Sequence, residues 1–540
     1  MILTKGRLIN VSNRLPVQIR KYSGALRAVH SSGGLATALD TLWGDQPGVW
    51  IGWPGEAHGR QVQTLLADAW KDRPQQLQAV MLSPDEIAKF YAGFANEIVW
   101  PLFHDLQSQC NFDPEYWETY EQVNRKFAAA ICETAEQDDC IWVHDYHLML
   151  VARYLREMGS RACVGFFQHI PFPSPDIFEK LPWRESILQA LLEYDVTGFQ
   201  TERDRDNFLN CLRRLLPGAR IEPTSPYPTV QFRARRTLVG AFPISIDFET
   251  FSGIAAKPGV AYRSAAIRKD LGEKIVVLGV DRLDYTKGIP ERLEAFRVLL
   301  RRFPELRRQI TLVQVVVPSR SDIPKYRELR LEIERLVSQI NGEFTQTGWV
   351  PIHYMHRSLR RDELVAHYRA ADIALITPLK DGMNLVAKEF CASQLDERGV
   401  LVVSEFAGAA QELRPGAILV NPYDFVGVAQ AIYHASQMDQ EEKHRRMSRL
   451  REIVRRNDVY CWARSFLETV TSQKNGTPAV AGGGGETDEM PRTALPRDVP
   501  GVALVAAAPA SVSRPFQRGL INRAEDLTDL GKRWWGPFPR

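Results

Sequence analysis

Two cations, Arg282 and Lys287, closely follow the strand-like segment Lys274–Val280 and stand at a predicted helix start. The helix macrodipole disfavours cations at that end, so the pair indicates an anion held between them and the helix amides. A phosphate or a diphosphate is the expected anionic ligand. The alternative is a set of surface ion pairs, Arg282 with Asp284 and Lys287 with Glu291, and these residues alone favour neither interpretation.

A second element, Asp381–Glu389, follows the strand-like segment Asp372–Ile376. Gly382 allows the backbone to come close to a ligand. Backbone amides at a helix start can bind a ligand directly, and here they belong to Met383, Asn384 and Leu385. The backbone of this element can therefore lie close to a ligand.

Two carboxylates of this element could accept hydrogen bonds from hydroxyl groups of a ligand. Asp381 can accept hydrogen bonds from sugar hydroxyls, and Glu389, one helical turn beyond Leu385, could take the two vicinal hydroxyls of a ribose. In the structural alternative, Asp381 caps the helix and Glu389 pairs with a surface lysine. The glycine-rich setting at a strand end favours the functional interpretation.

Histidine and aspartate follow two further strands. The run His144-Asp145-Tyr146-His147 directly follows Ile141–Val143, and His169 follows Val164–Phe167 in a loop made rigid by prolines. A metal site would need a helix and a further ligand beside the two histidines of the run, and no partner cluster is evident. Contact with a sugar or an acceptor is therefore favoured. A lone histidine is more often structural, but the strand-end position makes His169 a candidate.

Arg14 and Arg320 also follow strand-like segments, and arginine suits bidentate phosphate binding. Gly33-Gly34, about twenty residues beyond Arg14, permits close approach of the backbone to a ligand. Three aromatic residues could stack on sugar faces, although core packing would explain each of them singly: Trp53, Tyr91 and Trp100.

Positioning these residues requires a scaffold of strands and helices. Short apolar, β-branched runs alternate with longer amphipathic stretches, which predicts parallel sheets with crossover helices. The strand candidates form two sets, before and after about residue 245: Arg7–Val11, Ile141–Val143, Val164–Phe167 and Val196–Phe199, then Lys274–Val280, Gln309–Val317, Asp372–Ile376 and Val400–Ser404. We therefore predict an α/β fold of two Rossmann-like, doubly wound domains, residues 1–245 and 246–473, with the ligands in a cleft between them.

The C-terminal part differs in composition. A helix near Asp458–Ser472 is expected to pack back on the N-terminal domain, and residues 474–540 are predicted to be a flexible tail because Gly, Pro, Ala and Ser dominate much of it. Within the tail, helical periodicity predicts a short amphipathic helix over residues 519–535. Docking of this helix on the body is favoured over a partner or membrane-surface role, because acidic residues dilute its basic face.

Composition limits the function classes. The chain has 540 residues, and its 44% hydrophobic and 25% charged residues are typical of a soluble globular protein. A net charge of +3 gives no global attraction for nucleic acid. No apolar run approaches the roughly 18 residues that span a bilayer, and the N-terminus lacks a signal-peptide core. Seven scattered cysteines without a C-x-x-C pair indicate reduced thiols in a cytoplasmic protein.

Together, ten segments resemble the trehalose-6-phosphate synthase family, retaining glycosyltransferases with two Rossmann-like domains (the B-type fold). The matches cover about residues 7–470, and they occur in order at residues 12–14, 32–35, 50–55, 100–104, 144–148, 169–173, 198–201, 282–288, 381–389 and 406–409.

The resemblance implies transfer of glucose from a nucleotide-glucose, usually UDP-glucose, to glucose 6-phosphate with retention, giving α,α-trehalose 6-phosphate. It implies no metal or other cofactor. The catalytic set that it implies is Asp145, His169, Arg282, Lys287 and Asp381. The implied donor-binding set is Gly34, His169, Arg282, Lys287, Asp381, Gly382, Met383, Asn384, Leu385, Val386 and Glu389.

The implied acceptor-binding set is Arg14, Trp53, Tyr91, Trp100, Asp145 and Arg320. Within it, the two arginines hold the acceptor phosphate, and Asp145 lies between donor and acceptor. The family is thought to work by front-face displacement, in which the leaving phosphate oxygen helps to deprotonate the acceptor and no protein nucleophile is required. Asp145 as a covalent nucleophile is the minority alternative.

Several expectations about partners and rivals follow. A separate phosphatase is expected, because the D-x-D-G motif of phosphatase-fused members is missing, and a homo-oligomer is expected. No nucleic acid or membrane partner is expected. The rival interpretations are a glucosylglycerol-phosphate synthase that uses glycerol 3-phosphate and a non-catalytic sugar-phosphate sensor. The aromatic set favours a sugar-sized acceptor, the complete motifs favour an enzyme, and the sequence leaves the nucleotide base open.

Overall fold

The computed structural model describes residues 6–22, 25–30, 39, 42, 47–55, 61–320 and 323–475. All of these residues belong to one compact unit, Met1–Gly482. Gly33, Gly34, and the predicted tail beyond residue 475 with its helix over 519–535 lie outside the described residues.

The first sheet has nine strands in the order β5-β4-β1-β6-β7-β8-β11-β10-β9. Its strands from β5 to β11 pair in parallel, and β10 and β9 add an antiparallel edge. The bounds are β1 Leu8–Arg14, β4 Gly48–Trp53, β5 Gln75–Ala79, β6 Cys140–His144, β7 Cys163–Phe167, β8 Val196–Phe199, β9 Arg220–Glu222, β10 Thr229–Phe232 and β11 Arg235–Ala241. A separate antiparallel pair is formed by β2 Val17–Tyr22 and β3 Ala25–His30.

The second sheet is parallel throughout, in the order β14-β13-β12-β15-β16-β17. Its bounds are β12 Ile275–Arg282, β13 Ile310–Val317, β14 Ile352–Met355, β15 Ile373–Ile376, β16 Val400–Ser404 and β17 Ile418–Val420. The order reverses between β12 and β15, and in doubly wound sheets ligands bind beyond the carboxyl ends at such a point. The first sheet reverses in the same way between β1 and β6.

Helices cover both faces of each sheet. Those that precede residue 245 are α2 Gln61–Trp70, α3 Pro84–Glu86, the π-helix η1 Ile87–Val99, α4 Trp100–Phe103, η2 Gln107–Gln109, α5 Pro114–Thr134, η3 Tyr146–Leu148, α6 Val151–Glu157, α7 Pro175–Phe178, α8 Arg184–Leu191 and α9 Glu202–Leu215. Those that follow are α10 Phe248–Ala256, α11 Pro258–Asp270, η4 Tyr285–Lys287, α12 Ile289–Arg302, η5 Pro304–Leu306, α13 Pro324–Phe344, α14 Arg361–Ala370, α15 Leu385–Ser393, α16 Ala409–Leu413, α17 Phe425–Gln437, α18 Gln440–Arg456 and α19 Val459–Asn475.

The burial pattern of the second sheet explains its layers. In β12 alternate residues enter different cores: Val277 packs with α12, α13 and α17, whereas Val276 and Leu278 pack with α10, α14, α15 and α18. Both faces are therefore apolar, which is the condition for a parallel sheet covered by crossover helices.

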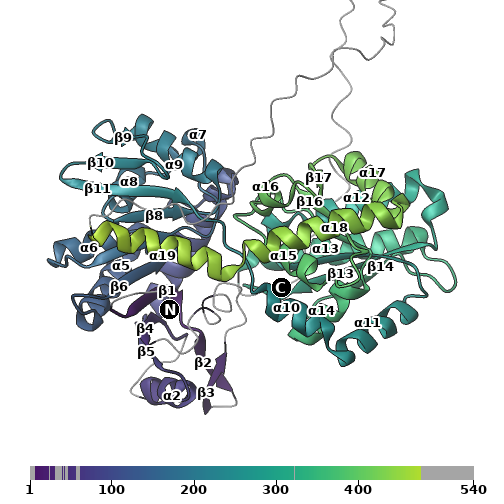
Figure 1. Ribbon diagram of the computed structural model, residues 1–540, viewed down its shortest axis with the longest axis horizontal. Coiled ribbons are helices and arrows are strands. Elements are labelled where there is room, and N and C mark those ends of the chain that lie inside the picture. The colour runs from purple at the N-terminus through teal and green to yellow at the C-terminus, as the bar shows by residue number, and fades with distance from the viewer. Residues whose placement is uncertain are drawn as a thin grey trace, which may run out of the picture. The chain divides into compact units, whose positions relative to one another are not determined.

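The last described helix, α19, lies along one face of the first sheet (Figure 1). Two glycines in neighbouring strands make room for it. A Cβ at Gly165 in β7 would lie 2.7 Å from Val470, and one at Gly198 in β8 would lie 2.7 Å from the Phe466 ring. Larger residues at these positions would hold the helix off the sheet.

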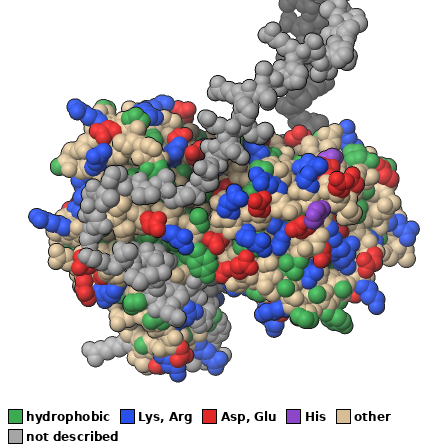
Figure 2. Space-filling model, viewed as in Figure 1, with side chains coloured by type: hydrophobic (Ala, Val, Ile, Leu, Met, Phe, Trp, Pro, Cys, Tyr) green, Lys and Arg blue, Asp and Glu red, His purple; other side chains and the backbone are tan. Residues whose placement is uncertain are grey.

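The predicted fold class, two doubly wound α/β sheets, is confirmed. The eight predicted strands are present, and most begin or end within one residue of the expected bounds, although β1 extends to Arg14 rather than Val11. The strands β2, β3, β4, β5, β9, β10, β11, β14 and β17 were not among the predicted ones. The division near residue 245 stays a prediction. The face in Figure 2 carries cationic and anionic side chains intermixed, in keeping with the small net charge.

Candidate active site

At the carboxyl edge of the second sheet, Lys287 and Asp381 form an ion pair. The Lys287 Nζ to Asp381 Oδ2 distance is 2.6 Å, and Asn384 Nδ2 donates to the same oxygen at 3.1 Å. Burial alone would raise the pKa of Asp381, but Lys287 holds it below its usual value. The turn that carries Lys287 ends at Gly288 (φ 62°), where a Cβ would lie 2.2 Å from the Thr377 carbonyl oxygen. This close approach fixes the lysine beside the loop after β15.

Arg282, the last residue of β12, is exposed, and its guanidinium forms no ion pair with a described carboxylate. Its positive charge nevertheless opposes the rise that burial causes in the pKa of Asp145, and together with Arg320 it holds the pKa of the buried Asp284 below its usual value. The surface pairs of Arg282 with Asp284 and of Lys287 with Glu291 are not formed among the described residues. Arg282 is therefore free to bind an incoming anion.

Helix α15 presents the other residues predicted to contact a donor. Its N-cap is Asn384, in a left-handed conformation (φ 84°), whose Oδ1 accepts from Ala387 N at 3.2 Å; the structural alternative in which Asp381 caps this helix is therefore wrong. Leu385 and Val386 are half-buried, and Glu389 Oε2 accepts from Tyr368 Oη at 2.7 Å. Burial raises the pKa of Glu389, and the surface lysine pairing is not formed among the described residues.

Asp145 follows β6 at the carboxyl edge of the first sheet. Its backbone has φ 73° and ψ 166°, a conformation that non-glycine residues rarely adopt, and its Oδ1 accepts from His169 N at 3.2 Å. Burial raises its pKa to about 6, against the lowering effect of backbone N–H groups and of Arg282. The carboxyl therefore changes charge just below neutral pH.

A cluster of arginines and aromatic rings lies beyond the same edge. The Arg14 guanidinium lies 4.0 Å from the Trp53 ring centroid and 4.9 Å from that of Tyr91, and Arg320 lies 4.3 Å from that of Trp100. Burial would raise the pKa of Tyr91, but the charges of Arg320 and Arg14 hold it below its usual value. We call these five residues the acceptor cluster.

Buried nitrogens in and beside this cluster have no hydrogen-bond partner. Nε1 of Trp53 and Nε1 of Trp100 are both unpaired, and so are both ring nitrogens of His147, which lies parallel to Tyr91 with centroids 6.0 Å apart. Buried polar groups are normally satisfied. Unpaired donors beside two arginines indicate a place for a ligand rich in acceptor oxygens, such as a phosphate.

The loops of the two sheets meet. Lys380 Nζ lies 2.5 Å from Asp105 Oδ2, and a Cβ at Gly382 would lie 2.2 Å from the His169 carbonyl oxygen. His104, from the first half of the chain, is influenced by charges of the second half: burial lowers its pKa to about 4, against the opposing charges of Asp284 and Asp381. Residues from both halves of the chain therefore form one site.

The structure also adds side chains to the predicted catalytic and binding sets. Asp284 is buried and accepts from Arg320 Nη1 at 3.4 Å, and the hydroxyl of Tyr326 contacts both. His104 and His147 complete the set. Asp284 had one available signal, its place between Arg282 and Lys287, whereas Tyr326 had none because it comes from the distant helix α13.

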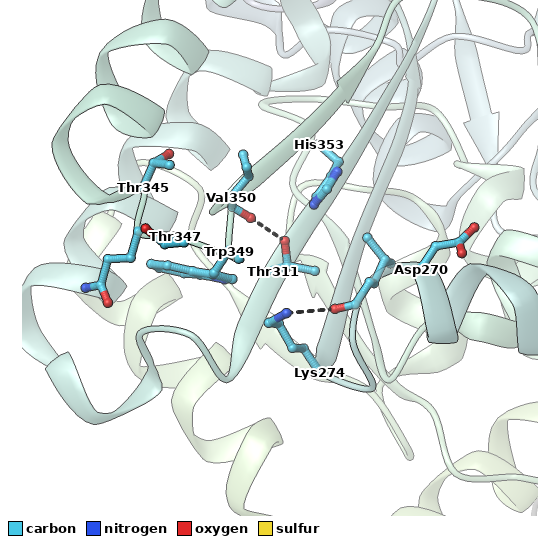
Figure 3. Close-up of a pocket in the computed structure, with 11 residues that line it drawn as sticks. Asp270, Lys274, Thr311, Thr345, Thr347, Trp349, Val350 and His353 are labelled. Carbon is cyan, nitrogen blue, oxygen red and sulfur yellow. Dashed lines mark hydrogen bonds between the residues drawn. The ribbon is translucent and has the colours of Figure 1, made fainter.

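Two further features of the described residues concern metal ions and cavities. None of their His, Cys, Asp and Glu side chains gather in groups of three or more that could hold a metal ion. A hollow of about 600 Å³ lies at the opposite edge of the second sheet, where Lys274, Thr311 and His353 stand near the strand starts (Figure 3). None of the residues predicted to do chemistry lines it.

The family of the chain follows from comparison with known proteins. The model of glycosyltransferase family 20 matches residues 6–472. The chain therefore belongs to glycosyltransferase family 20. It is 43% identical over 489 residues to the trehalose-6-phosphate synthase of Mycolicibacterium smegmatis, covering 89% of this chain and 95% of that protein. It is also 43% identical to a bifunctional trehalose-6-phosphate synthase/phosphatase of Thermoproteus tenax, over 87% of this chain and 64% of that protein.

Solved structures of trehalose-phosphate synthases are also similar to this chain. An α,α-trehalose-phosphate synthase (UDP-forming) from Burkholderia xenovorans in complex with glucose 6-phosphate matches with a TM-score of 0.78 and 33% identity, over 86% of this chain and all of that one. The Escherichia coli protein bound with UDP-2-fluoro glucose matches with a TM-score of 0.77 and 34% identity, over 86% and 99%. Separately, no described helix has the length and apolarity needed to cross a bilayer.

Proposed function

We propose that this protein transfers glucose from UDP-glucose to glucose 6-phosphate with retention, forming α,α-trehalose 6-phosphate and UDP. One observation carries the proposal: the site contains two sets of cations. Arg282 and Lys287 lie at the carboxyl edge of the second sheet, whereas Arg14 and Arg320 lie on the rings of Trp53 and Trp100. Each set can hold one anionic group.

On the donor side, Arg282 and Lys287 bind the diphosphate and stabilise the charge that develops as it leaves. Lys287 exchanges part of its contact with Asp381 for the ligand, and Asp381 with the amides beyond Gly382 holds the sugar. Glu389 keeps one oxygen on Tyr368 and offers the other to the ribose, with Leu385 and Val386 beside the base. His169 contacts the glucose. Gly34 belongs to the same proposal by resemblance alone.

On the acceptor side, Arg14 and Arg320 hold the phosphate of glucose 6-phosphate, and the unpaired indole donors of Trp53 and Trp100 add hydrogen bonds. Tyr91 lies between the two cations. Binding a remote phosphate positions the acceptor hydroxyl without taking part in the bond change. Because Arg320 follows β13, the second half of the chain completes an acceptor site otherwise built by the first.

The bond change needs no protein nucleophile. The glucose C1–O bond to the diphosphate breaks, the acceptor oxygen bonds to C1 on the same face, and the acceptor proton passes to the leaving phosphate oxygen. Asp145, ionised above pH 6, lies between donor and acceptor and stabilises the positive charge that develops on the sugar. The cations that stabilise the leaving group make a metal ion unnecessary in this proposal.

The same proposal includes four further points, on location, dephosphorylation of the product, assembly and domains. The described cysteines are all free, which supports a cytoplasmic location. The product is dephosphorylated by a separate phosphatase. The protein assembles as a homo-oligomer, and residues 1–245 and 246–473 form the acceptor-binding and nucleotide-sugar-binding domains.

The test is an assay of the purified full chain with UDP-glucose and either glucose 6-phosphate or glycerol 3-phosphate, with NMR identification of the product linkage. We expect release of UDP only with glucose 6-phosphate. Turnover restricted to glycerol 3-phosphate would identify the rival transferase. Binding of UDP-glucose without turnover would identify a sensor.

A further inference from the structure

A buried and a half-buried imidazole are joined by a hydrogen bond beneath the proposed donor site. His144 ends β6 and is fully buried, and its Nδ1 lies 3.0 Å from Nε2 of His169, which follows the neighbouring strand β7. The β6–β7 pairing sets this contact, because His144 is aligned with Phe167, two residues before His169. Since Nε2 of His169 is occupied in this way, Nδ1 is the ring nitrogen left for a ligand.

Both rings are neutral near neutral pH. Burial lowers the pKa of His144 well below its usual value and lowers that of His169 to about 3. A neutral imidazole has one N–H donor and one acceptor nitrogen, so one ring must donate and the other accept. Two arrangements are then open, and they leave opposite groups on Nδ1 of His169.

The second nitrogen of His144 decides between them. Its Nε2 is buried and has no hydrogen-bond partner. If His169 donated, the His144 proton would sit on this unpaired nitrogen, and unpaired buried N–H groups are rarer in proteins than unpaired acceptors. If His144 donates from Nδ1, its Nε2 is only an unused acceptor.

We propose that His144 is a positioning residue, which donates its Nδ1 proton to His169 and thereby holds His169 in the tautomer that presents Nδ1–H to an oxygen of the donor sugar. The main chain of His169 is held separately, since its N–H donates to Asp145 Oδ1. Ring and backbone are therefore fixed by two different residues that follow one another in the chain. The step that concerns the sugar rests on the function proposed above, whereas the tautomer does not.

The first test needs no substrate. Protein labelled with ¹⁵N-histidine is studied by two-bond ¹H–¹⁵N correlation, which shows which ring nitrogen carries the proton, and the His169 signals are identified by their loss in His169→Asn. We expect the proton of His169 on Nδ1. A proton on Nε2 would overturn the inference, whatever the protein catalyses.

The second test uses two variants of nearly equal shape. His144→Asn keeps an N–H donor close to the position of Nδ1, whereas His144→Leu has none. We expect His144→Leu to lower kcat/KM for UDP-glucose about tenfold, the effect of one lost hydrogen bond, with the KM for glucose 6-phosphate unchanged within about twofold. His144→Asn should recover most of the loss, and equal impairment of the two variants would contradict a donor role.

The outcomes separate the two proposals. If the wild-type chain lacks transferase activity while the NMR shows Nδ1–H, the proposed function fails and the tautomer assignment stands. If it is active but His169 carries its proton on Nε2, only the present inference fails. His353→Leu, at the opposite edge of the second sheet, serves as the control for loss of a histidine and should leave both kinetic constants unchanged.

Discussion

The donor edge and the acceptor cluster are both rich in cations, but they hold them differently. At the donor edge, Arg282 is exposed and Lys287 is paired with Asp381. In the acceptor cluster, Arg14 and Arg320 lie on aromatic rings, and Arg320 also pairs with the buried Asp284. A ring fixes a guanidinium before the ligand arrives, so little side-chain freedom is lost on binding. The donor lysine must instead exchange one anion for another, which suits a group that is held and then released.

Removing the exposed cation of the donor edge should have the largest effect. Arg282→Ala is expected to lower kcat about 10²–10³-fold, because the leaving diphosphate loses a fixed positive charge. Steady-state kinetics with saturating glucose 6-phosphate will measure this. Arg301→Ala is the control, because Arg301 pairs with Glu343 on the surface of α12, and it should remain within about twofold of wild type. An equally small effect of Arg282→Ala would remove the donor assignment.

Asp145 lies between the two regions and should link activity to stability. Its folded-state pKa, about 6, is raised from 3.8, so the carboxyl stabilises the fold below pH 3.8 and that contribution is lost as pH rises through 6. Asp145→Asn should therefore increase the free energy of unfolding at pH 7.5 by up to about 3 kcal/mol and change it little at pH 3.5. Thermal melts at the two pH values measure the difference.

The kinetic counterpart is a pH profile. Wild-type kcat/KM should fall below pH 6, and Asp145→Asn should be slow and lack that limb. A variant that is no more stable than wild type at pH 7.5 would show that burial does not penalise this carboxylate.

In the acceptor cluster the expected loss is smaller and depends on the phosphate. Arg320→Ala should lower kcat/KM for glucose 6-phosphate about 10–100-fold, as expected for a hydrogen bond to a charged group, and should leave the slow reaction with glucose nearly unchanged. Arg320→Lys keeps the charge and serves as a check on folding, since Asp284 retains a cation. Equal losses with both acceptors would indicate a structural effect rather than phosphate binding.

The contact between the two regions should matter least. The Lys380–Asp105 pair is partly exposed, and such pairs contribute roughly 0–1 kcal/mol. Asp105→Asn, which suits the left-handed backbone at this position (φ 63°), should lower the free energy of unfolding by less than about 1 kcal/mol and change kcat by less than about threefold. Urea titration and steady-state kinetics will test this, and a tenfold loss of kcat would mean that the pair controls the approach of the two edges.

The parts of the site that follow strands were predictable from the residues. Apolar runs locate β12 and β15, and the polar residues that follow these runs, Arg282 and Asp381, must then lie at one sheet edge. The same reasoning placed Asp145 and His169. What it could not decide was pairing, because the partner of Lys287 is a residue almost a hundred positions away, not its neighbour Glu291.

The acceptor cluster was not predictable from spacing. Trp53 ends a strand, Tyr91 lies in a π-helix and Trp100 starts a short helix, so no periodicity brings them together, and only the family resemblance grouped them. That the ring nitrogens of His147 have no hydrogen-bond partner could not be predicted from the sequence, for another reason. Whether a buried histidine has a hydrogen-bond partner depends on packing from several elements, and neither the composition of the chain nor its hydrophobic periodicity indicates it.

The space that Gly165 and Gly198 leave for α19 has a consequence for biosynthesis. The strands of both sheets are synthesised before α19 is complete. Nevertheless, β7 and β8, from the first half of the chain, are covered only after Phe466 and Val470 have been made. The order of synthesis and the order of assembly therefore differ, and a nascent chain stopped near residue 458 should display an apolar surface that attracts chaperones.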